Sequence, residues 1–446
     1  MKALVVTALP APQVSAEQNG IARRFGAFLR ALNRVSHDIT LLHIVPEAAR
    51  AAAGPLDELS RAQSKFWGVP VRIVLEAQRT RPETRWNHYG AGILEVGAQP
   101  EWFPCGGADL AAAVGHRLDE QPDLVFAHRL QTMLPLMRSG RRLPPVILDM
   151  DDIEHRVLIR RAFSKPFYPG KQAQLLQVPA LFRLEQRAVA ASRLALVCSE
   201  TDRAYLRRLG FGSKVQVVPN SLPVPAAPPG VVSEPTVLFL GDMRYMPNRL
   251  AAERMMREIW PLVRARLPEA RLLVAGRESD QLTAANSGLS GVELLGFVAD
   301  LDGLYARSRV VCCPITLGGG TRLKLIEAAS YARPIVSTRL GAEGLSLTDG
   351  REALLRDGNA GFAAACVTLL QDDALCLRLG EAARAVMTAA YDVRQVEERI
   401  AQMVLEATGQ KASQLQVFGS DGHVTQVANA MRLPGGTQHP PRRQAG

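Results

Sequence analysis

Short apolar runs alternate with amphipathic stretches along most of the chain. In the first half, the runs that we predict to be buried β-strands are 3–7, 39–44, 71–75, 124–127, 146–149, 194–198 and 215–218. Between several of them, apolar residues recur at helical spacing, most clearly over 109–118, 173–191 and 201–209. Continuous apolar strands that alternate with helices are typical of a parallel sheet covered on both faces.

A second series of the same kind follows a proline-rich segment, residues 219–235, which cannot continue a helix or a central strand. Its predicted strands are 237–240, 271–275, 292–295, 310–313 and 334–337, and its predicted helices are 248–266, 301–307, 321–331, 361–370 and 374–389. We therefore predict two doubly wound, Rossmann-like α/β domains, residues 1–218 and 236–392, which face each other across a cleft. Ligands bind at the carboxyl ends of the strands in such folds.

The two ends of the chain differ from this pattern. A last helix is predicted over 393–408, and the tail over 409–446 is rich in Gly, Gln, Ser and Pro, which predicts disorder. At the other end, the apolar run 3–9 after Lys2 resembles a short secretory signal. A first buried strand is favoured, because a polar loop over 10–20 then leads into an amphipathic helix, as in a βα unit.

Composition narrows the class of protein. With 446 residues, 47% hydrophobic and 22% charged, the chain fits two or three globular domains and excludes a coiled coil or a collagen. No window is apolar enough for a membrane span. The six cysteines include no C-x-x-C pair, and Cys312 and Cys313 stand in an apolar run, which indicates buried thiols in a reducing compartment.

Charge is distributed unevenly. The net charge is +10, and residues 1–215 hold 29 Lys and Arg against 20 Asp and Glu. A basic half suggests an anionic partner, for which nucleic acid, an anionic membrane surface or a phosphate-linked substrate would all fit. The helix predicted over 21–32 is the segment expected to lie on anionic lipid, unless its amphipathicity is that of an ordinary packed helix. Its basic and aromatic residues are Arg23, Arg24, Arg30, Phe25 and Phe28.

The most specific segment runs from Pro314 through three consecutive glycines to Glu327. A strand is predicted to end at Pro314 and a helix to start near Thr321. Glycines let a backbone approach a ligand closely, and a helix start offers unpaired N–H groups to an anion. With the charges of Arg322 and Lys324, the segment predicts a phosphate cradle; the alternative is a flexible loop before a solvated basic helix face. The spacing fits neither a Walker A loop nor a G-x-G-x-x-G fingerprint.

The second half resembles the C-terminal domain of family 4 glycosyltransferases over roughly residues 236–390. The segments that carry the resemblance are Phe239-Leu-Gly-Asp-Met-Arg244, Gly296-Phe-Val-Ala-Asp300, the glycine turn with Glu327, Pro334-Ile-Val-Ser-Thr and Gly341-Ala-Glu-Gly-Leu. The first half resembles the family more loosely, through Gly20 with Arg23 and Arg24, Ser36-His-Asp and Val217-Val-Pro-Asn.

The resemblance implies a two-domain enzyme of GT-B type that moves a sugar from a nucleotide-diphosphate donor with retention at the anomeric carbon. It implies that Glu327 binds the ribose hydroxyls and that Arg244 and Lys324 stand beside the diphosphate in catalytic roles. It also implies that the backbone at Phe297 and Val298 faces the base. No metal and no cofactor are expected, because the donor loop carries its own cations.

The chain departs from the family at two points in this half. The lysine that usually follows Arg244 is missing, and Asn248 and Arg249 stand there instead. The family's E-x7-E pattern places a glutamate at position 319, which is Gly319 in this chain. Recognition of sugar hydroxyls is therefore in question, and the backbone N–H groups of Gly319 and Gly320 are expected to substitute, with Thr321 and Arg322 completing the donor-binding loop.

Candidate residues in the first half are less specific. Gly20 is expected in the first strand-to-helix loop, either close to the diphosphate or as an ordinary turn glycine. His128 follows the strand 124–127, where the resemblance implies a histidine on the acceptor side; the alternative is a packed or exposed histidine. Both are at the predicted edge of the cleft.

An acidic segment, residues 149–154, follows the strand 146–149. The resemblance implies carboxylates there that orient the acceptor or act as a base without metal, and Asp151 is the candidate. A second interpretation is structural, with Asp152 capping a helix that starts at Ile153. A third is a D-x-D metal site, which in other glycosyltransferases bridges a cation to the diphosphate.

The sequence thus predicts a retaining, metal-independent glycosyltransferase of bacterial polysaccharide biosynthesis. Its expected partners are a nucleotide sugar, a glycan or lipid-linked acceptor and an anionic membrane surface, without nucleic acid. We expect it in the cytoplasm or on the inner face of the plasma membrane. The alternatives are a sugar-nucleotide epimerase of the same architecture and a carbohydrate-binding protein that has lost catalysis.

Overall fold

The computed structural model describes residues 1–9, 20–78, 105, 107–163, 167, 171–230, 232–282 and 288–410. The predicted tail over 409–446 lies outside the described residues except for Gly409 and Gln410. Most of the predicted polar loop over 10–20 lies outside them as well.

Seven parallel strands form the first sheet, in the spatial order β3-β2-β1-β4-β5-β6-β7. They are β1 (Lys2–Thr7), β2 (Asp38–Pro46), β3 (Arg72–Gln78), β4 (Leu124–His128), β5 (Val146–Asp151), β6 (Leu194–Val197) and β7 (Val215–Val217). The helices between them are α1 (Gly20–Asn33), α2 (Glu47–Ala51), α3 (Leu56–Trp67), α5 (Ala108–Asp119), α6 (Leu130–Arg138), α7 (Glu154–Ala162), the short 3-10 helix η1 (Gln172–Gln177), α8 (Val178–Ala191) and α9 (Glu200–Arg208). Each strand coincides with one of the predicted runs to within a few residues.

Alternation along β1 shows why both faces of this sheet are covered. Val5 packs in one core with Phe25 and Phe28 of α1, whereas Leu4 packs in the other core with Val114 of α5. Successive side chains of a strand point to opposite faces, so a strand that is apolar at every position needs helices on both sides.

Six parallel strands form the second sheet, in the order β10-β9-β8-β11-β12-β13. They are β8 (Thr236–Leu240), β9 (Arg271–Ala275), β10 (Val292–Gly296), β11 (Val310–Cys313), β12 (Ile335–Ser337) and β13 (Leu354–Leu355). The helices are α10 (Met246–Arg254), the π-helical turn η2 (Met255–Ile259), α11 (Trp260–Arg264), the 3-10 turn η3 (Ser279–Gln281), α12 (Leu301–Ala306), α13 (Leu323–Ser330), α14 (Asn359–Gln371), α15 (Asp373–Tyr391) and α16 (Val393–Thr408). Two parallel sheets flanked by helices confirm the predicted fold class.

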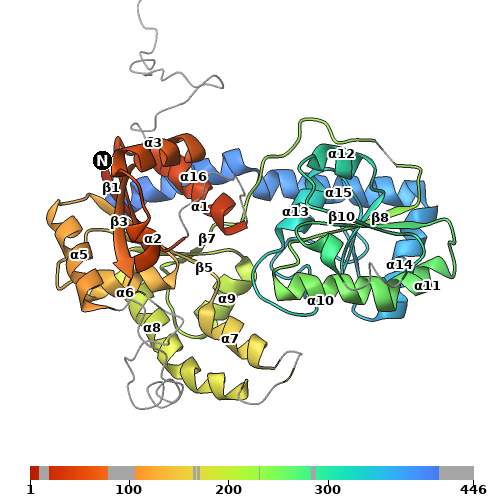
Figure 1. Ribbon diagram of the computed structural model, residues 1–446, viewed down its shortest axis with the longest axis horizontal. Coiled ribbons are helices and arrows are strands. Elements are labelled where there is room, and N and C mark those ends of the chain that lie inside the picture. Colours follow the sequence, from red (N-terminus) through yellow and green to blue (C-terminus); the bar gives the residue numbers. More distant parts are fainter. Residues whose placement is uncertain are drawn as a thin grey trace, which may run out of the picture.

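The chain crosses between the two sheets twice, and the crossings are hydrogen-bonded to each other. Residues 219–235 lead from β7 to β8, and Leu222 exchanges backbone hydrogen bonds with Tyr391 and Val393 at the junction of α15 and α16. Asp392 caps α16 by accepting from the N–H of Arg394 at 2.9 Å. Figure 1 shows α16, in blue, returning from the second half to lie beside α1 of the first.

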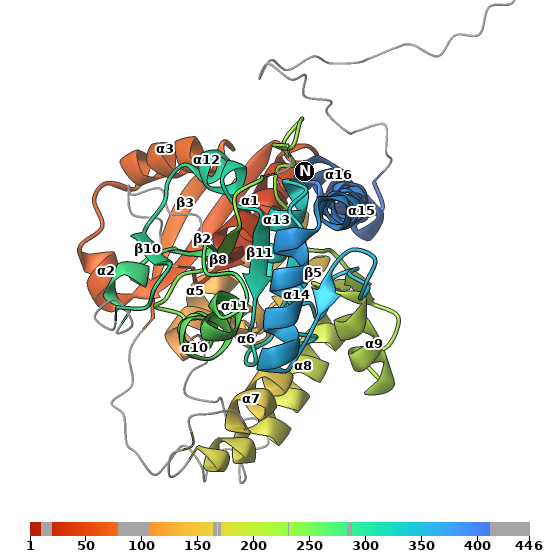
Figure 2. The ribbon, with the colours of Figure 1, turned by 90° about the vertical axis from the view of Figure 1, so that its right-hand side faces the viewer.

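Figure 2 views the molecule from the side of the second half, with α14 in blue in front of β11 and with α15 and α16 to one side of it. Among the helices that the structure describes, no single one is both long and apolar enough to cross a membrane. The bent pair α14 and α15 passes that test only when the two are taken together, by length and composition alone.

The structure contradicts the expectation that helix 21–32 lies on lipid. Phe25 and Phe28 are 0% and 1% exposed, in the core between the sheet and α16. Arg24 is buried as well, and Arg30 pairs with Glu397 of α16 at 2.6 Å. The amphipathicity of this helix is that of an ordinary packed helix, so its aromatic face is not available to a membrane.

Candidate active site between the two sheets

The glycine turn lies at the carboxyl edge of the second sheet, directly after β11. Gly318 and Gly320 have φ angles of +107° and +71°, which side chains rarely adopt. The helix that follows begins at Leu323, two residues later than predicted, because Arg322 is extended and takes the N-cap position. Among the described residues, the N–H groups of Gly318 to Thr321 donate to no partner, so they are available to a ligand.

Lys324 lies on the first turn of α13 and is mostly buried. Its ammonium donates to the amide oxygen of Asn248 at 2.8 Å and stands 4.7 Å from the ring centroid of Phe239. Burial lowers the pKa of Lys324. Within the described part of the chain no carboxylate pairs with this ammonium, so an uncompensated cation points into the site.

Glu327 lies one turn further along α13 and is 9% exposed. Its carboxylate accepts from Arg23 of α1 at 3.1 Å and from the hydroxyl of Tyr305 at 3.2 Å. Tyr305 is fully buried and stacks on Tyr331, with ring centroids 4.4 Å apart. The carboxylate is thus fixed between the two halves, with two donors in place.

Two of the predicted donor-side residues lie at the rim. Arg244 is exposed and donates to Asp242 at 2.5 Å, so its charge is already matched by a carboxylate. Phe297 is 61% exposed, and the guanidinium of Arg277 lies 4.8 Å from its ring centroid. Val298 follows Phe297 in the segment between β10 and α12 and packs against the core of the second half.

On the facing edge of the first sheet, Arg24 and Asp149 form a buried ion pair. The guanidinium donates to both carboxylate oxygens, with a shortest distance of 2.6 Å, and also to the carbonyl of Val218 and the amide oxygen of Asn220. Asp149 is therefore committed to holding α1 and the end of β7 against β5. The hydrogen bonds from Arg24 satisfy the carboxylate of Asp149, which is 0% exposed.

Two non-glycine residues at this edge have positive φ angles. Arg129 follows β4 with φ +70°, and Asp151 ends β5 with φ +57° beside an irregularity in the strand register. The Asp151 carboxylate lies 3.9 Å from both Arg24 and Arg129. Backbone of this kind is held by its surroundings and is common at functional sites.

Two carboxyl groups of the acidic segment 149–154, those of Asp152 and Glu154, have raised pKa values. Burial, reinforced by Asp151, raises the pKa of Asp152 to about 6, and burial raises that of Glu154 to about 7. Glu154 accepts from Arg129 at 3.3 Å. The capping interpretation of Asp152 is wrong, because α7 starts at Glu154 and its N-cap, Ile153, has no side-chain cap.

His128 lies at the end of β4 and is 1% exposed. Its Nδ1 is 3.0 Å from the hydroxyl of Thr7, its ring packs on Phe25, and its Nε2 has no hydrogen-bond partner among the described residues. Burial lowers the pKa of His128 to about 3, so the imidazole is neutral at physiological pH. A neutral imidazole has one donor and one acceptor nitrogen, so the free Nε2 can donate or accept a hydrogen bond, depending on the tautomer.

Gly20 is the first residue of α1 rather than part of a preceding loop. A Cβ on Gly20 would lie 2.6 Å from the side chain of Leu323. The absence of a side chain therefore lets the start of α1 approach the start of α13 across the cleft.

Other contacts also join the halves. Asn220 donates to the Thr321 hydroxyl at 2.8 Å, and Arg156 and Arg160 of α7 donate to Glu343 at 2.6–2.8 Å. Behind the Arg23–Glu327 pair lies a cavity of about 430 Å³. Its lining residues are Arg23, Arg30, Ser221, Leu222, Pro223, Glu327, Tyr331 and Val393.

Sequence reasoning missed several of these contacts. Tyr305 gave no signal, because a tyrosine at a helical core spacing is indistinguishable from packing. Asn248 did give one, since it stands where the family has a lysine, and in the structure it holds Lys324. Glu343 lies in the segment Gly341-Ala-Glu-Gly-Leu, which the resemblance singled out without a role.

Two family profiles match the chain. The family described as "Glycosyl transferase 4-like domain" matches residues 19–221, and "Glycosyl transferases group 1" matches residues 234–372. The first match covers most of the seven-stranded sheet and the second covers the six-stranded one.

Two curated proteins are similar over part of their length. Phosphatidyl-myo-inositol mannosyltransferase of Mycobacterium leprae is 32% identical over 219 residues, which are 46% of this chain and 57% of that protein. An uncharacterized 44.6 kDa protein in the cps region of Klebsiella pneumoniae is 28% identical over 136 residues, 28% of this chain and 35% of that protein. The chain thus spans between a third and just over half of the length of these relatives.

Solved structures share the fold at low sequence identity. HepE of Anabaena, in complex with UDP and glucose, aligns with a TM-score of 0.60 and 17% identity over 91% of this chain and 99% of that one. Sucrose-phosphate synthase from Thermosynechococcus elongatus aligns with a TM-score of 0.65 and 16% identity over 92% and 99%. Both alignments extend over the two sheets together.

Proposed function

The chain belongs to the group 1 glycosyltransferases of GT-B fold, and on that premise we propose that it is a retaining, metal-independent enzyme. It transfers a sugar from a nucleotide-diphosphate donor to a glycan or lipid-linked acceptor. The donor occupies the carboxyl edge of the second sheet and the acceptor occupies that of the first.

The observation that carries the proposal is the uncompensated ammonium of Lys324. A mostly buried cation is normally paired, and its nearest polar partner here is the neutral amide of Asn248. The free N–H groups of the glycine turn converge on the same helix start, which favours an anion. A diphosphate provides the missing negative charge, and its charge grows as the sugar leaves, so this arrangement stabilises the departing group.

The other predicted residues take supporting roles around that centre. Glu327 accepts hydrogen bonds from the two ribose hydroxyls, because a carboxylate has two oxygens that can each accept one. Gly319, Gly320, Thr321 and Arg322 line the diphosphate. Because Arg244 is paired with Asp242, it reaches the donor only after exchanging that partner.

The acceptor hydroxyl attacks from the face that the diphosphate leaves, through an oxocarbenium-like state. Its proton passes to the leaving phosphate oxygen, so no enzymic base is required. Asp151 and the neutral imidazole of His128 orient the acceptor through hydrogen bonds, and the lowered pKa of His128 supports the neutral form. Contacts between the halves, including Arg156 and Arg160 with Glu343, exclude water from the reactive sugar.

The proposal also places the enzyme in the cytoplasm, in polysaccharide biosynthesis, with peripheral attachment to anionic lipid. The basic excess of residues 1–215 supports the attachment, although α1 no longer does. Flotation with anionic and neutral vesicles tests it. Binding that is equal on both and insensitive to salt would count against it.

The test of the function is incubation with a panel of labelled nucleotide sugars in EDTA. The proposal expects slow release of nucleoside diphosphate even without acceptor. An isomerised nucleotide sugar would identify an epimerase, and no reaction despite donor binding would identify a non-catalytic protein. If EDTA abolished the activity and added Mn²⁺ or Mg²⁺ restored it, the enzyme would depend on a metal. The acidic segment 149–154 would then be its candidate binding site.

A further inference from the structure

The glycine turn lacks a side chain at the position where this family carries a carboxylate, and the space beside it is not empty. A Cβ built on Gly319 would lie 3.7 Å from Oδ1 of Asp152, and one built on Gly320 would lie 3.0 Å from the same atom. Asp152 comes from the opposite half of the molecule, directly after β5. A carboxylate from the first half therefore lies against the turn of the second.

Asp152 is free to bind a ligand, unlike its acidic neighbours. Asp149 is held by Arg24, and Glu154 is held by Arg129. Within the described part of the chain, the Asp152 carboxylate has neither a hydrogen bond nor an ion pair. The positive φ of Asp151 turns the chain at this point, immediately before Asp152 leaves the sheet.

Arg322 provides a second, independent sign of a ligand at the turn. The residue is 8% exposed, and one guanidinium nitrogen donates to the carbonyls of Gly319 and Gly320. Its Nε and Nη2 are buried without a partner among the described residues. A Cβ built on Gly318 would lie 3.4 Å from that Nη2 and 3.1 Å from the hydroxyl of Tyr245. Two guanidinium nitrogens and a carboxylate that lack hydrogen-bond partners among the described residues thus surround one short turn.

We propose that Asp152 supplies, from the other half of the molecule, the carboxylate that recognises hydroxyls of the donor sugar in place of the side chain missing at Gly319. The inference rests on the proposed function. A carboxylate can accept hydrogen bonds from two vicinal hydroxyls, and the side chains of Arg322 and Tyr245 complete a group of polar atoms of the kind that distinguishes one sugar from another.

This arrangement has a mechanistic consequence. A carboxylate at position 319 would recognise the sugar whether or not the halves are together. Asp152 reaches the sugar only when they are, so recognition of the correct sugar and closure of the cleft become one event. The sugar moiety, rather than the nucleotide, then stabilises the closed arrangement.

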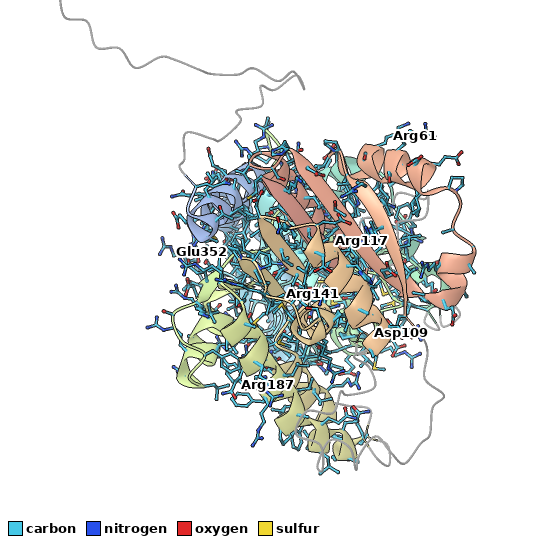
Figure 3. All side chains as sticks on the ribbon, turned by 90° about the vertical axis from the view of Figure 1, so that its left-hand side faces the viewer. Arg61, Asp109, Arg117, Arg141, Arg187 and Glu352 are labelled. Carbon is cyan, nitrogen blue, oxygen red and sulfur yellow. The ribbon has the colours of Figure 1, made fainter. Side chains whose placement is uncertain are left out.

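The test compares the affinity for a nucleoside diphosphate with that for its sugar conjugate, by calorimetry. UDP is compared with UDP-glucose, UDP-galactose and UDP-N-acetylglucosamine, and GDP is compared with GDP-mannose. The conjugate that the wild type binds most tightly is then used to test the variants. Asp152→Ala and the isosteric Asp152→Asn should weaken that conjugate ~10- to 100-fold and the bare diphosphate less than about twofold. Asp119→Asn is the control, since its partner Arg141 lies on the face of the first half turned away from the second (Figure 3).

Restoring the missing side chain provides the decisive variant. Gly319→Glu should recover most of the lost affinity in the Asp152→Ala background, whereas a merely structural Asp152 could not be replaced from the other half. Val157→Ala is combined with it, because a Cβ on Gly319 would lie 3.0 Å from the Val157 side chain.

The outcomes separate the inference from the function. If no nucleoside diphosphate of the panel binds, the proposed function fails and the inference fails with it. Two outcomes overturn only the inference, provided that the wild type binds the diphosphate. In one, the Asp152 variants bind the sugar conjugate as tightly as the wild type does. In the other, they lose affinity equally for the conjugate and for the bare diphosphate. Absence of recovery in a Gly319→Glu variant that melts as the wild type does would overturn it as well.

Discussion

Glu327 is held by donors from two different parts of the chain, Arg23 and Tyr305, and the proposed donor complex would keep only one of them. Tyr305 lies beneath it on α12, whereas Arg23 comes from the other half. Ribose hydroxyls would take the place of Arg23, so Tyr305 keeps the carboxylate in position and Arg23 occupies the site when the donor is absent.

Removing the Tyr305 hydroxyl should therefore affect donor binding more than chemistry. Tyr305→Phe is expected to raise the donor KM ~3- to 10-fold with kcat largely kept, because a ribose contact exists equally in ground and transition states. Tyr205→Phe is a matched control that removes a hydroxyl from His155 in the first half. Steady-state kinetics at varied donor concentration measure both constants. A fall in kcat by the same factor as the rise in donor KM would contradict this role.

A buried histidine makes the first half sensitive to mild acid. His43 is 1% exposed, and burial lowers its pKa to about 4. Between pH 6.5 and about 4 the unfolded chain takes up a proton that the folded chain does not, so the stability falls as the pH falls, by about 2 kcal/mol at pH 5 for this residue. His43→Leu should make the free energy of unfolding, measured with urea, depend less on pH in this range. An unchanged dependence on pH would contradict a buried, neutral His43.

At the scale of elements, α7 of the first half and the segment after β12 of the second are joined through one carboxylate. Glu343 accepts from both Arg156 and Arg160, and these side chains are 18–26% exposed. Breaking this contact should shift the halves apart without unfolding either sheet.

Glu343→Gln is expected to lower kcat/KM about fivefold, since partly exposed pairs contribute on the order of 1 kcal/mol. The fraction of donor lost to hydrolysis should rise, because a looser cleft admits water. Glu120→Gln, which removes an exposed contact with Arg72 and Arg117, serves as the control. A hydrolysis fraction identical to the wild type would mean that this contact does not govern closure.

Helix α16 belongs to the core of the first half although it follows the second in sequence. Its buried side chains are Val396, Ile400, Ala401, Val404 and Leu405. A chain that ends at residue 392 exposes the apolar surface over α1, which should cost more than about 5 kcal/mol and lower Tm by ~10 °C or more, or prevent folding.

A chain that ends at residue 410 is the matched control for that truncation. It keeps α16 whole and should melt within about 2 °C of the full chain. Calorimetry and turnover together check both chains. If the shorter deletion abolished activity while folding was kept, residues 411–446 would have to bind the acceptor or a partner.

At the scale of the whole molecule, the fold could be predicted from the sequence because the central strands are apolar at nearly every position. The runs near Leu4, Leu41 and Leu148 predicted β1, β2 and β5, which are strands of one sheet. β13 was missed because two residues carry no periodicity, and α6 because Pro135 stands inside it. The π-turn η2 was read as continuous helix, since a single extra residue does not disturb a helical pattern over so short a segment.

The site was predictable only within each half. The glycine turn, Lys324 and Glu327 lie on consecutive turns of one segment, so their proximity followed from the chain itself. The contacts of Arg23 with Glu327 and of Asp152 with the turn join residues far apart in sequence, and no local pattern encodes how two sheets face each other. The membrane expectation for helix 21–32 failed for the same reason, because the partner that covers it, α16, lies at the other end of the chain.

The central claim is that the ammonium of Lys324 binds the donor diphosphate, and the kinetics of Lys324→Ala test it most directly. The account predicts a fall in kcat/KM of roughly 30- to 1000-fold with Tm within a few degrees, since a charge-assisted contact to a phosphate that gains charge contributes about 2–4 kcal/mol. Lys324→Arg should recover only part, because a guanidinium does not reproduce a compact ammonium beside Asn248 and Phe239. Near-full turnover of a labelled nucleotide sugar by Lys324→Ala would contradict the phosphate cradle and the role given to residues 314–327.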